Sequence, residues 1–461
     1  MIISDFSFGS GKGKNALLIN PYIYDTRYWD KWSLPYGLLR IGTLLKNKGF
    51  KTTLIDCLNS TNFIIKKEKI GIKEVGDISL SFYRYGISQK EFIKELDALD
   101  FYPDQVLITS IMTYWWKSTK EVVDIIKSKF PKATVLIGGI YPSLCSEHAL
   151  ENIKADYIIK GEVNEASDLW LDLNLYNNKP TYCVVTSSRG CPYNCAQCAQ
   201  KMINGKGVRH RDPEDVINEI IYYYEKFEVR KIAFYEDNIL INPESHFEKI
   251  LELIIKNNKK ILLSAPEGFE VRRLYLELLT KMRLAGFKSI YLPLEIASLD
   301  NEYSLDQKNV KIEEFDRAVD LCAKAGFKPG IRQDLNAFIL YGVPNQPIDL
   351  LIETILFAVH RVGNVTPMLY SPVPGSVLHT RYEEYFKTNN FDLEDLNGKL
   401  FPFWKMNNVL PSDYLNIQRL MYCFHTQFHG RPFDILEDSL ISNSFRKSIE
   451  KWNAYGRDNE K

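Results

Sequence analysis

The N-terminal third of the chain alternates short apolar runs with segments whose apolar residues recur at helical spacing. The runs cover residues 16–20, 52–57, 105–110, 134–137 and 157–160, and helical spacing appears at 38–45 and 122–130. Continuous apolar runs of this length are typical of strands buried on both faces of a parallel sheet. We therefore predict a doubly wound α/β domain over residues 15–168, after a leader at 1–14, with ligand loops at the carboxyl ends of its strands.

A second alternation follows a stretch at 169–181 that is rich in asparagine and contains a proline, which we interpret as a linker. Strand-like runs at 182–187, 231–235, 261–264, 289–295, 335–341 and 366–370 are separated by helical segments such as 213–224, 274–285 and 312–325. Such units predict an open, partial (β/α)6 barrel over residues 182–385, with its active site at the C-terminal strand ends. Residues 386–461 are aromatic and helical in pattern, and we expect them to cap the barrel.

A cluster of cysteines falls directly after the first expected barrel strand. Cys191, Cys195 and Cys198 form a C-x3-C-x2-C pattern on one short loop. Three thiolates can hold three irons of a [4Fe-4S] cluster, and without a nearby fourth cysteine the fourth iron stays open to another ligand. The alternative is a zinc site, which would need a fourth ligand such as Cys183 or His210 to complete a tetrahedron.

Composition narrows the setting of this site. Lys plus Arg equals Asp plus Glu at 58 each, so the net charge gives no general attraction to nucleic acid or to an acidic membrane surface. The chain shows no apolar run of the roughly 18 residues that a membrane span needs, and no secretory signal. We therefore expect a cytoplasmic protein, whose five other, scattered cysteines are packed thiols rather than disulfides.

Residues 189–198 resemble the S-adenosylmethionine (SAM) loop of the radical SAM enzymes. The resemblance implies a [4Fe-4S] cluster whose free iron binds SAM, and an electron transfer that cleaves SAM to a 5′-deoxyadenosyl radical. It also implies SAM contacts at the barrel strand ends, and Leu294-Glu-Ile-Ala-Ser resembles the Glu-Ser-Gly-Ser of the family's fourth strand. The expected SAM contacts are Gln197, which replaces the family's usual aromatic residue, and Glu236, Asp237, Ser264, Glu295, Ser298 and Tyr341. Arg209 and Arg211 are candidates for binding a carboxylate of SAM or of the substrate, with plain surface charge as the alternative.

Turns of the N-terminal domain resemble those of the cobalamin-binding domain that precedes many radical SAM cores. They read Leu34-Pro-Tyr-Gly-Leu-Leu, Ile137-Gly-Gly-Ile-Tyr-Pro-Ser and Ile159-Lys-Gly-Glu. The cobalt-ligating Asp-x-His-x-x-Gly motif is absent, as is usual in this class, and the loop with Trp115 and Trp116 is the candidate for the lower face of the cobalt. There the two tryptophans would pack over the corrin, with blocking of the corrin or filling of the core as the alternatives. The expected cobalamin contacts are Pro35, Tyr36, Gly37, Ser110, Met112, Thr113, Tyr114, Trp115, Gly138, Gly139, Tyr141, Pro142, Gly161 and Glu162.

The resemblance implies an α/β fold with a Rossmann-like cobalamin-binding domain, a partial TIM-barrel radical SAM core and a helical C-terminal region. It implies an enzyme similar to the class B radical SAM methyltransferases, which use one SAM to generate a substrate radical and another to methylate cob(I)alamin. A radical SAM enzyme that rearranges, cyclises or couples its substrate, with or without cobalamin, is one alternative, and a zinc-bearing binding module is another. We expect a small-molecule, lipid or peptide substrate and an electron donor such as flavodoxin or ferredoxin.

Overall fold

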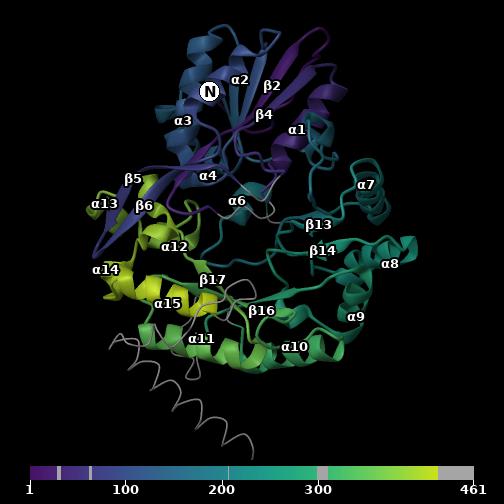
Figure 1. Cartoon of the computed structure of the whole chain (residues 1–461), viewed down its shortest axis with the longest axis vertical. Coiled ribbons are helices and arrows are strands. Elements are labelled where there is room, and N and C mark those ends of the chain that lie inside the picture. Colours follow the sequence, from purple (N-terminus) through teal and green to yellow (C-terminus); the bar gives the residue numbers. More distant parts are fainter. Residues whose placement is uncertain (29–32, 62–64, 206, 298–309, 424–461) are drawn as a thin grey trace, which may run out of the picture.

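The structure is a computed structural model, and it describes residues 1–28, 33–61, 65–205, 207–297 and 310–423. Figure 1 shows an N-terminal unit (purple and blue) above a barrel-like unit (teal and green), with the C-terminal helices (yellow-green) on one side of the barrel. The N-terminal unit is built on a parallel sheet in the order β1-β9-β8-β7-β2-β4. These strands are β1 (Ile2–Ile3), β2 (Asn15–Asn20), β4 (Lys51–Asp56), β7 (Gln105–Thr109), β8 (Thr134–Gly138) and β9 (Tyr157–Ile159).

Helices cover both faces of this sheet because its strands bury residues on both sides. Leu17, Val106 and Ile137 pack into one apolar cluster, whereas their chain neighbours Leu18, Leu107 and Leu136 pack into another. One cluster is completed by α2 (Gln89–Asp97), α3 (Trp116–Lys129), α4 (Ile140–Leu144) and α5 (Ser146–Asn152), and the other by α1 (Tyr36–Asn47). The predicted doubly wound topology is confirmed.

The first residues of the chain belong to this sheet. Ile2 and Ile3 pair in parallel with Ile158 and Ile159 and so form an edge strand. The amino group of Met1 donates a hydrogen bond to the carbonyl of Asp156 at 2.9 Å. The prediction of a leader over residues 1–14 is therefore wrong for its first residues, since backbone pairing fixes them to β9.

The N-terminal unit also carries an antiparallel sheet that the sequence pattern did not predict. Its order is β3-β6-β5, from β3 (Ile23–Asp25), β6 (Ile78–Tyr85) and β5 (Lys67–Val75). Gly76 turns the hairpin with a φ of +57°, and a Cβ there would lie 2.8 Å from Pro411 Cγ. The Ser412 amide donates to Asp77 Oδ1 at 3.2 Å. The tip of the hairpin therefore packs against the C-terminal region.

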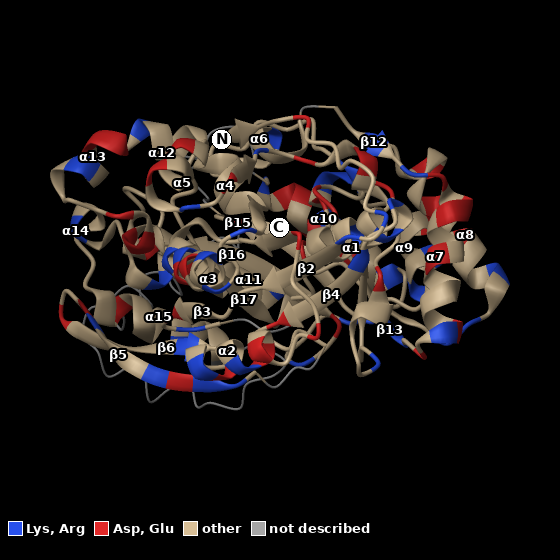
Figure 2. Ribbon diagram, turned by 90° about the horizontal axis from the view of Figure 1, so that it is seen from above, with Lys and Arg blue, Asp and Glu red and all other residues tan. Residues whose placement is uncertain are grey.

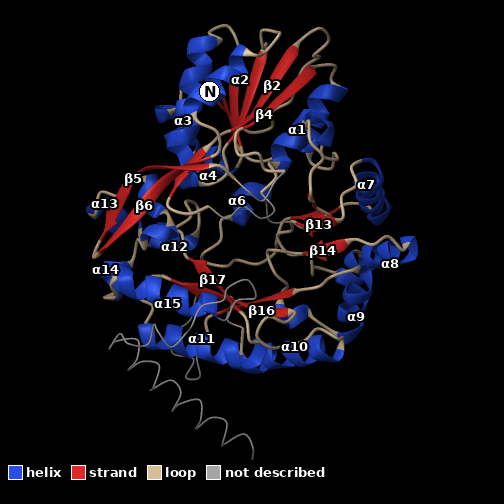
Figure 3. Ribbon diagram, in the orientation of Figure 1, coloured by secondary structure: helices blue, strands red, loops and turns tan. Residues whose placement is uncertain are grey.

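The predicted barrel strands are all present, arranged in two parallel sheets. One sheet contains β10 (Cys183–Val185), β13 (Lys231–Phe234) and β14 (Leu262–Ser264), and the other contains β15 (Ile290–Glu295), β16 (Leu335–Tyr341) and β17 (Val365–Leu369). An isolated parallel bridge joins Leu263 to Phe287 just before β15. Figure 3 shows α7 (Pro213–Lys226), α8 (Phe247–Asn257), α9 (Leu276–Ala285), α10 (Ile312–Lys324) and α11 (Ile348–Val362) along the outside. This arrangement is an open partial barrel.

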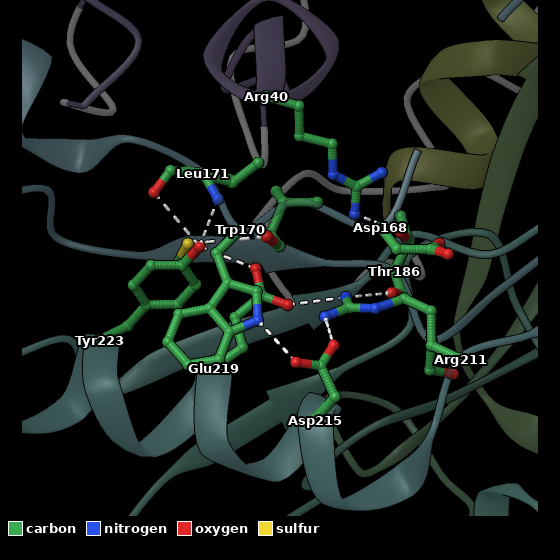
Figure 4. Close-up of polar contacts among 12 residues, drawn as sticks. Arg40, Asp168, Trp170, Leu171, Thr186, Arg211, Asp215, Glu219 and Tyr223 are labelled. Carbon is green, nitrogen blue, oxygen red and sulfur yellow. Dashed lines mark hydrogen bonds and ion pairs between the residues drawn. The ribbon is translucent and has the colours of Figure 1, made fainter. Parts of the chain in front are cut away.

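The predicted linker is packed against the barrel. Leu171 and Leu173 are buried in the barrel's apolar core. Trp170 Nε1 donates to Asp215 on α7 at 3.1 Å, and the Leu171 amide donates to the Tyr223 hydroxyl at 2.6 Å (Figure 4). The segment thus fixes the N-terminal unit to α7.

The described part of the C-terminal region is helical, as predicted. It contains α12 (Val377–Arg381), α13 (Glu383–Thr388), α14 (Trp404–Asn407) and α15 (Pro411–Cys423). Lys73 pairs with Glu394, and Lys399 pairs with Asp25, so this region is joined to the N-terminal unit. The rest of the predicted cap, 424–461, lies outside the described residues. Within the described ranges, no helix is long and apolar enough to cross a bilayer.

Candidate functional site

The cysteine loop begins where the first barrel strand ends, as predicted. It runs from β11 (Ser188–Arg189) to α6 (Gln200–Asn204), and β11 pairs antiparallel with β12 (Arg209–His210) to close its base. Gly190 has a φ of +87°, and a Cβ on it would lie 2.1 Å from the carbonyl oxygen of Gly207. Glycine is therefore required where the two segments cross.

The three thiols of this loop differ in exposure. Cys191 and Cys195 are half-buried, and Cys198 is exposed. The Cys198 amide donates to the Cys195 carbonyl at 3.1 Å, which tightens the second half of the loop. Across the described residues, no three His, Cys, Asp or Glu side chains lie close enough together to hold a metal ion. The donor set itself, three thiols without a fourth cysteine on the loop, suits a [4Fe-4S] cluster with an open iron, and the ligand role of each cysteine stays a prediction.

The two candidates for a fourth zinc ligand, Cys183 and His210, lie in different surroundings. Cys183 is fully buried within β10, and its thiol faces the carbonyl oxygen of Val184 at 3.6 Å. His210 packs against His246 with ring centroids 4.2 Å apart. Cys183 is therefore engaged away from the loop, whereas His210 lies on β12 at the base of the loop with its ring against His246.

Glu236 lies two residues after the end of β13 and holds the backbone that leads into the cysteine loop. Its carboxylate accepts hydrogen bonds from the amides of Ser187 and Ser188, the second at 2.8 Å, and from the Ser188 hydroxyl at 2.6 Å. Burial raises the pKa of the Glu236 carboxyl, and the hydrogen bonds from these serines oppose that shift. A residue expected to contact SAM is thus engaged with the protein's own backbone.

Asp237 holds the cysteine loop at both of its ends. It accepts hydrogen bonds from the Gly190 amide at 2.5 Å, from Asn204 Nδ2 at 3.0 Å and from the side chain of Gln200. Burial raises the pKa of the Asp237 carboxyl, and the hydrogen bond from Asn204 opposes this most strongly. Glu236 and Asp237 therefore shape the loop, whereas their contact with SAM stays a prediction.

Gln197 and Glu295, both expected SAM contacts, lie together. Gln197 Nε2 donates to Glu295 Oε2 at 3.2 Å. Glu295 has a φ of +63° at a register shift in the β15 and β16 pairing, and a bulge of this kind re-aims a side chain. Gln197 Oε1 is buried and has no hydrogen-bond partner among the described residues. The pair therefore offers an acceptor to a donor such as an amino group of SAM.

The two other expected SAM contacts that the structure describes at strand ends, Ser264 and Tyr341, form no hydrogen bond with Gln197 or Glu295. Ser264 ends β14 and is half-buried. Tyr341 ends β16 and is fully buried, with its ring centroid 6.2 Å from that of Tyr414. Ser298 lies outside the described residues.

A cavity of about 1010 Å³ lies between the carboxyl ends of the N-terminal sheet and the barrel. Its walls come from the N-terminal unit, the barrel strand ends and the C-terminal region. This volume is at the upper end of the range for ligand pockets. The expected cobalamin contacts that line it are Pro35, Tyr36, Gly37, Met112, Tyr114, Trp115, Gly138, Gly139, Gly161 and Glu162.

The other expected cobalamin contacts lie behind the cavity wall. The Ser110 hydroxyl is buried and bonds Thr119 Oγ1 at 2.8 Å, and Thr113 and Pro142 are also buried. Tyr141 is fully buried, with its hydroxyl 2.9 Å from His148 Nδ1. Their side chains pack into the domain and do not line the cavity, so their contact with cobalamin stays a prediction without support from the cavity wall.

The two adjacent tryptophans lie in different places. Trp115 lines the cavity, and its Nε1 donates to Asp25 Oδ2 at 2.9 Å. Trp116 Nε1 donates to Asp392 Oδ1 at 3.1 Å, and its ring centroid lies 4.8 Å from that of His148, away from the cavity. Trp115 therefore lines the cavity and Trp116 does not, and corrin contact by Trp115 stays a prediction.

Glycines leave room for a broad ligand in front of the sheet. A Cβ added to Gly37 or Gly161 would meet no atom within 4 Å, and one added to Gly138 would first meet Ile159 at 3.9 Å. All three residues line the cavity, so a flat macrocycle could approach the strand ends closely. The wall therefore fits a corrin.

The arginines considered for a ligand carboxylate have acidic partners in the protein. Arg211 is buried and pairs with Glu219 at 2.7 Å and with Asp215 at 2.5 Å (Figure 4). Arg209 pairs with Glu162 at 2.6 Å. Arg211 is therefore a structural residue of the barrel, and neither interpretation made from the sequence describes it.

Sequence reasoning missed several cavity residues. Tyr235, Tyr291, Phe338 and Lys399 line the cavity, and the first three lie on barrel strands or directly after them. Glu267 also lines it, from the loop after β14. Tyr235 and Glu267 follow the ends of β13 and β14, and this position was the available signal for these two residues. Tyr291 and Phe338 lie within β15 and β16, and Lys399 lies in the C-terminal region.

Two protein-family profiles match the chain in the order that the structure shows. Residues 33–169 match the B12 binding domain, and residues 185–358 match the Radical SAM superfamily. Together with the cysteine loop and the cavity, these matches define a radical SAM protein. More particularly, the chain belongs to the radical SAM proteins that carry a B12 binding domain ahead of the radical SAM domain, and this organisation implies SAM, a [4Fe-4S] cluster and cobalamin as cofactors.

Curated relatives align with much of the chain at low identity. The chain is 21% identical over 390 residues to the bacteriochlorophyllide d C-12(1)-methyltransferase of Chlorobaculum tepidum, covering 75% of this chain and 81% of that protein. It is 25% identical over 267 residues to an uncharacterized methyltransferase of Pyrococcus horikoshii, covering 57% of this chain and 54%, about half, of that protein.

Solved structures show the same fold. The radical SAM methyltransferase TsrM from Kitasatospora setae, with cobalamin and a [4Fe-4S] cluster bound, superimposes with a TM-score of 0.58 at 14% identity, covering 81% of this chain and 78% of that chain. The cobalamin-dependent radical enzyme OxsB, with aqua-cobalamin and SAM bound, gives a TM-score of 0.55 at 15% identity, covering 82% and 62%.

Proposed function

We propose that the protein is a cobalamin-dependent radical SAM enzyme that transfers a methyl group to an unactivated carbon. One observation carries the proposal: a single cavity is walled both by the strand ends of the B12 binding domain and by those of the radical SAM barrel. A ligand on the first wall and a substrate on the second would face each other without intervening protein.

In this proposal, Cys191, Cys195 and Cys198 hold the cluster, and Asp237 fixes both ends of their loop. Gln197 and Glu295 orient SAM, with Gln197 Oε1 as the acceptor. When bound, the cofactors supply the radical and the methyl group, whereas the protein orients the reactants and excludes water.

The wall around Tyr36, Gly138 and Gly161 would hold the corrin, with Trp115 packed at its edge. The names of relatives support methyl transfer: they include a bacteriochlorophyllide methyltransferase and a cytidylyl-2-hydroxyethylphosphonate methyltransferase of Streptomyces wedmorensis. Because those substrates differ in chemistry, they do not indicate the substrate of this chain.

The protein would also need a one-electron donor, and we include a flavodoxin or ferredoxin of the cytoplasm in the proposal. The exposed side of the cysteine loop at Cys198 offers access to such a donor. Figure 2 shows acidic and basic residues intermixed over the ribbon in that view, so the contact would depend on local rather than overall charge.

The test is anaerobic reconstitution with iron, sulfide and hydroxocobalamin, followed by reduction in the presence of SAM. We expect retained corrin absorbance, 5′-deoxyadenosine and S-adenosylhomocysteine. A variant with Cys191, Cys195 and Cys198 replaced by alanine should lose iron and 5′-deoxyadenosine. Deoxyadenosine without retained corrin or S-adenosylhomocysteine would contradict methyl transfer and favour a radical rearrangement, cyclisation or coupling.

A further inference from the structure

Glu267 occupies an unusual position in the cavity. It lies in the loop after β14, at the carboxyl end of the third barrel strand, and lines the cavity. The side chain is exposed although protein surrounds it, because its exposed surface faces the cavity. Its carboxyl group is therefore accessible mainly to whatever enters the cavity.

No described residue donates a hydrogen bond to Glu267 or forms an ion pair with it. The cations that line the cavity have other contacts: Arg189 pairs with Glu162 at 3.1 Å, Lys399 pairs with Asp25, and Arg40 donates to Thr186 Oγ1 at 2.5 Å. The Arg27 guanidinium lies over the ring of Tyr422, 4.8 Å from its centroid. Burial raises the pKa of the Glu267 carboxyl, and the nearby charge of Asp237 raises it further. Within the described part of the chain, this acid thus has no cation to stabilise it.

The loop that presents Glu267 is held firmly. Gly268 has a φ of +84°, and a Cβ there would lie 3.0 Å from both Phe338 Cε2 and Pro293 Cγ. The Gly268 amide donates to the Ala265 carbonyl at 3.1 Å, and the Phe269 amide donates to the Tyr291 carbonyl at 2.9 Å. Since only glycine fits this contact, the backbone next to Glu267 is fixed against the aromatic wall.

Aromatic rings surround the space that Glu267 faces. Tyr291 and Phe338 stack with centroids 5.3 Å apart, and Tyr36 and Tyr235 lie 5.9 Å apart. All four residues line the cavity. Burial raises the pKa of Tyr36 and of Tyr235, and the charge of Glu267 adds to both shifts. Aromatic faces attract cations and cover flat apolar groups, and a carboxylate adds a charge-assisted hydrogen bond.

We propose that Glu267 binds a protonated amine on the substrate, whose apolar or aromatic body lies between these rings. The inference rests on the proposed function, since the substrate meant here is the molecule that would receive the methyl group. Other donors that enter the cavity, namely the amino and ribose hydroxyl groups of SAM and the amides of the corrin, share this chemistry. The substrate is favoured because none of the expected SAM contacts that the structure describes lines the cavity, and Glu267 belongs to the barrel wall rather than to the corrin wall.

The experiment uses the reconstituted holoenzyme and a matched pair of probes, 2-phenylethylamine and 3-phenylpropionate, with binding measured by equilibrium dialysis. We expect the amine to bind about tenfold more tightly or better, the magnitude of a charge-assisted hydrogen bond. Glu267→Gln should abolish the preference, whereas the control Glu313→Gln, on the exposed face of α10, should retain it. Equal binding of the two probes, no binding of the amine, or an unchanged preference in Glu267→Gln overturns the proposal.

Two further measurements on Glu267→Gln distinguish the substrate from SAM and from the corrin as the partner of this carboxyl group. SAM affinity and retained corrin absorbance should equal those of the unsubstituted protein. A fall in SAM affinity would assign the carboxyl to SAM, and a loss of corrin would assign it to the corrin amides, and either result overturns the substrate assignment. If methyl transfer fails while the Glu267-dependent preference for the amine persists, the proposed function is wrong and the binding site stands.

Discussion

The neighbouring strands β13 and β14 end in carboxyl groups that have opposite surroundings. Glu236 and Asp237, after β13, accept hydrogen bonds from the backbone and side chains of the cysteine loop and its approach. Glu267, after β14, has no such donor among the described residues and faces the cavity. Burial raises the pKa of all three carboxyl groups, but hydrogen bonds oppose the shift at the first two.

The difference teaches that an acid at a barrel strand end is not by itself evidence for ligand contact. A carboxylate that accepts several internal donors is part of the scaffold, and its removal leaves those donors unsatisfied. A carboxylate held in place without a donor retains its full capacity to bind a ligand. This contrast predicts that substitutions at the two strand ends will change stability in opposite directions.

The largest effect is expected for Glu236→Ala. The substitution leaves the amides of Ser187 and Ser188 and one hydroxyl without their acceptor, at about 1–3 kcal/mol for each buried donor. We expect the free energy of unfolding to fall by about 3 kcal/mol or more, measured as the shift of the urea midpoint. Glu313→Ala, an exposed control, should change it by less than about 0.5 kcal/mol. A shift for Glu236→Ala no larger than that of the control would show that water replaces the carboxylate. The difference between the carboxyl groups after β13 and after β14 would then be smaller than proposed.

Asp237→Ala should have a smaller effect on global stability and a specific effect on the loop. The Gly190 amide and Asn204 lose their acceptor, but the region is half-buried and water can replace part of the interaction. We expect a loss of about 1–2 kcal/mol and a lower iron content per chain after reconstitution. Asp237→Asn keeps one acceptor oxygen, so its free energy of unfolding and its iron content should lie between those of Asp237→Ala and those of the unsubstituted protein. Full iron content in Asp237→Ala would show that the cluster itself, once bound, shapes the loop.

The contrast also marks what the sequence could predict. Apolar runs predicted the strands closely, as for residues 335–341, because burial on both faces leaves a continuous signal. The hairpin of β5 and β6 was missed, since most of β5 is exposed and its apolar residues alternate weakly. The cysteines were visible from their spacing, whereas Glu236 and Glu267 are both acids after a strand. Only the tertiary position of the cysteine loop distinguishes them.

The smallest effect, and the one of opposite sign, is expected for Glu267→Gln. A carboxyl group whose pKa is raised by folding favours the folded state below its unfolded pKa, and this contribution is lost as the pH rises through the folded pKa. The groups that face Glu267 are Asp237, Tyr36 and Tyr235, and none supplies a positive charge. The glutamine variant should therefore be slightly more stable than the unsubstituted protein at pH 8, by a few tenths of a kcal/mol at most, since water in the cavity screens the charge. The difference should disappear toward the lowest pH at which the chain stays folded. Thermal unfolding at both pH values checks this, and a glutamine variant that is less stable at pH 8 would mean that Glu267 supports the fold, as Glu236 does, and that the two strand ends are alike.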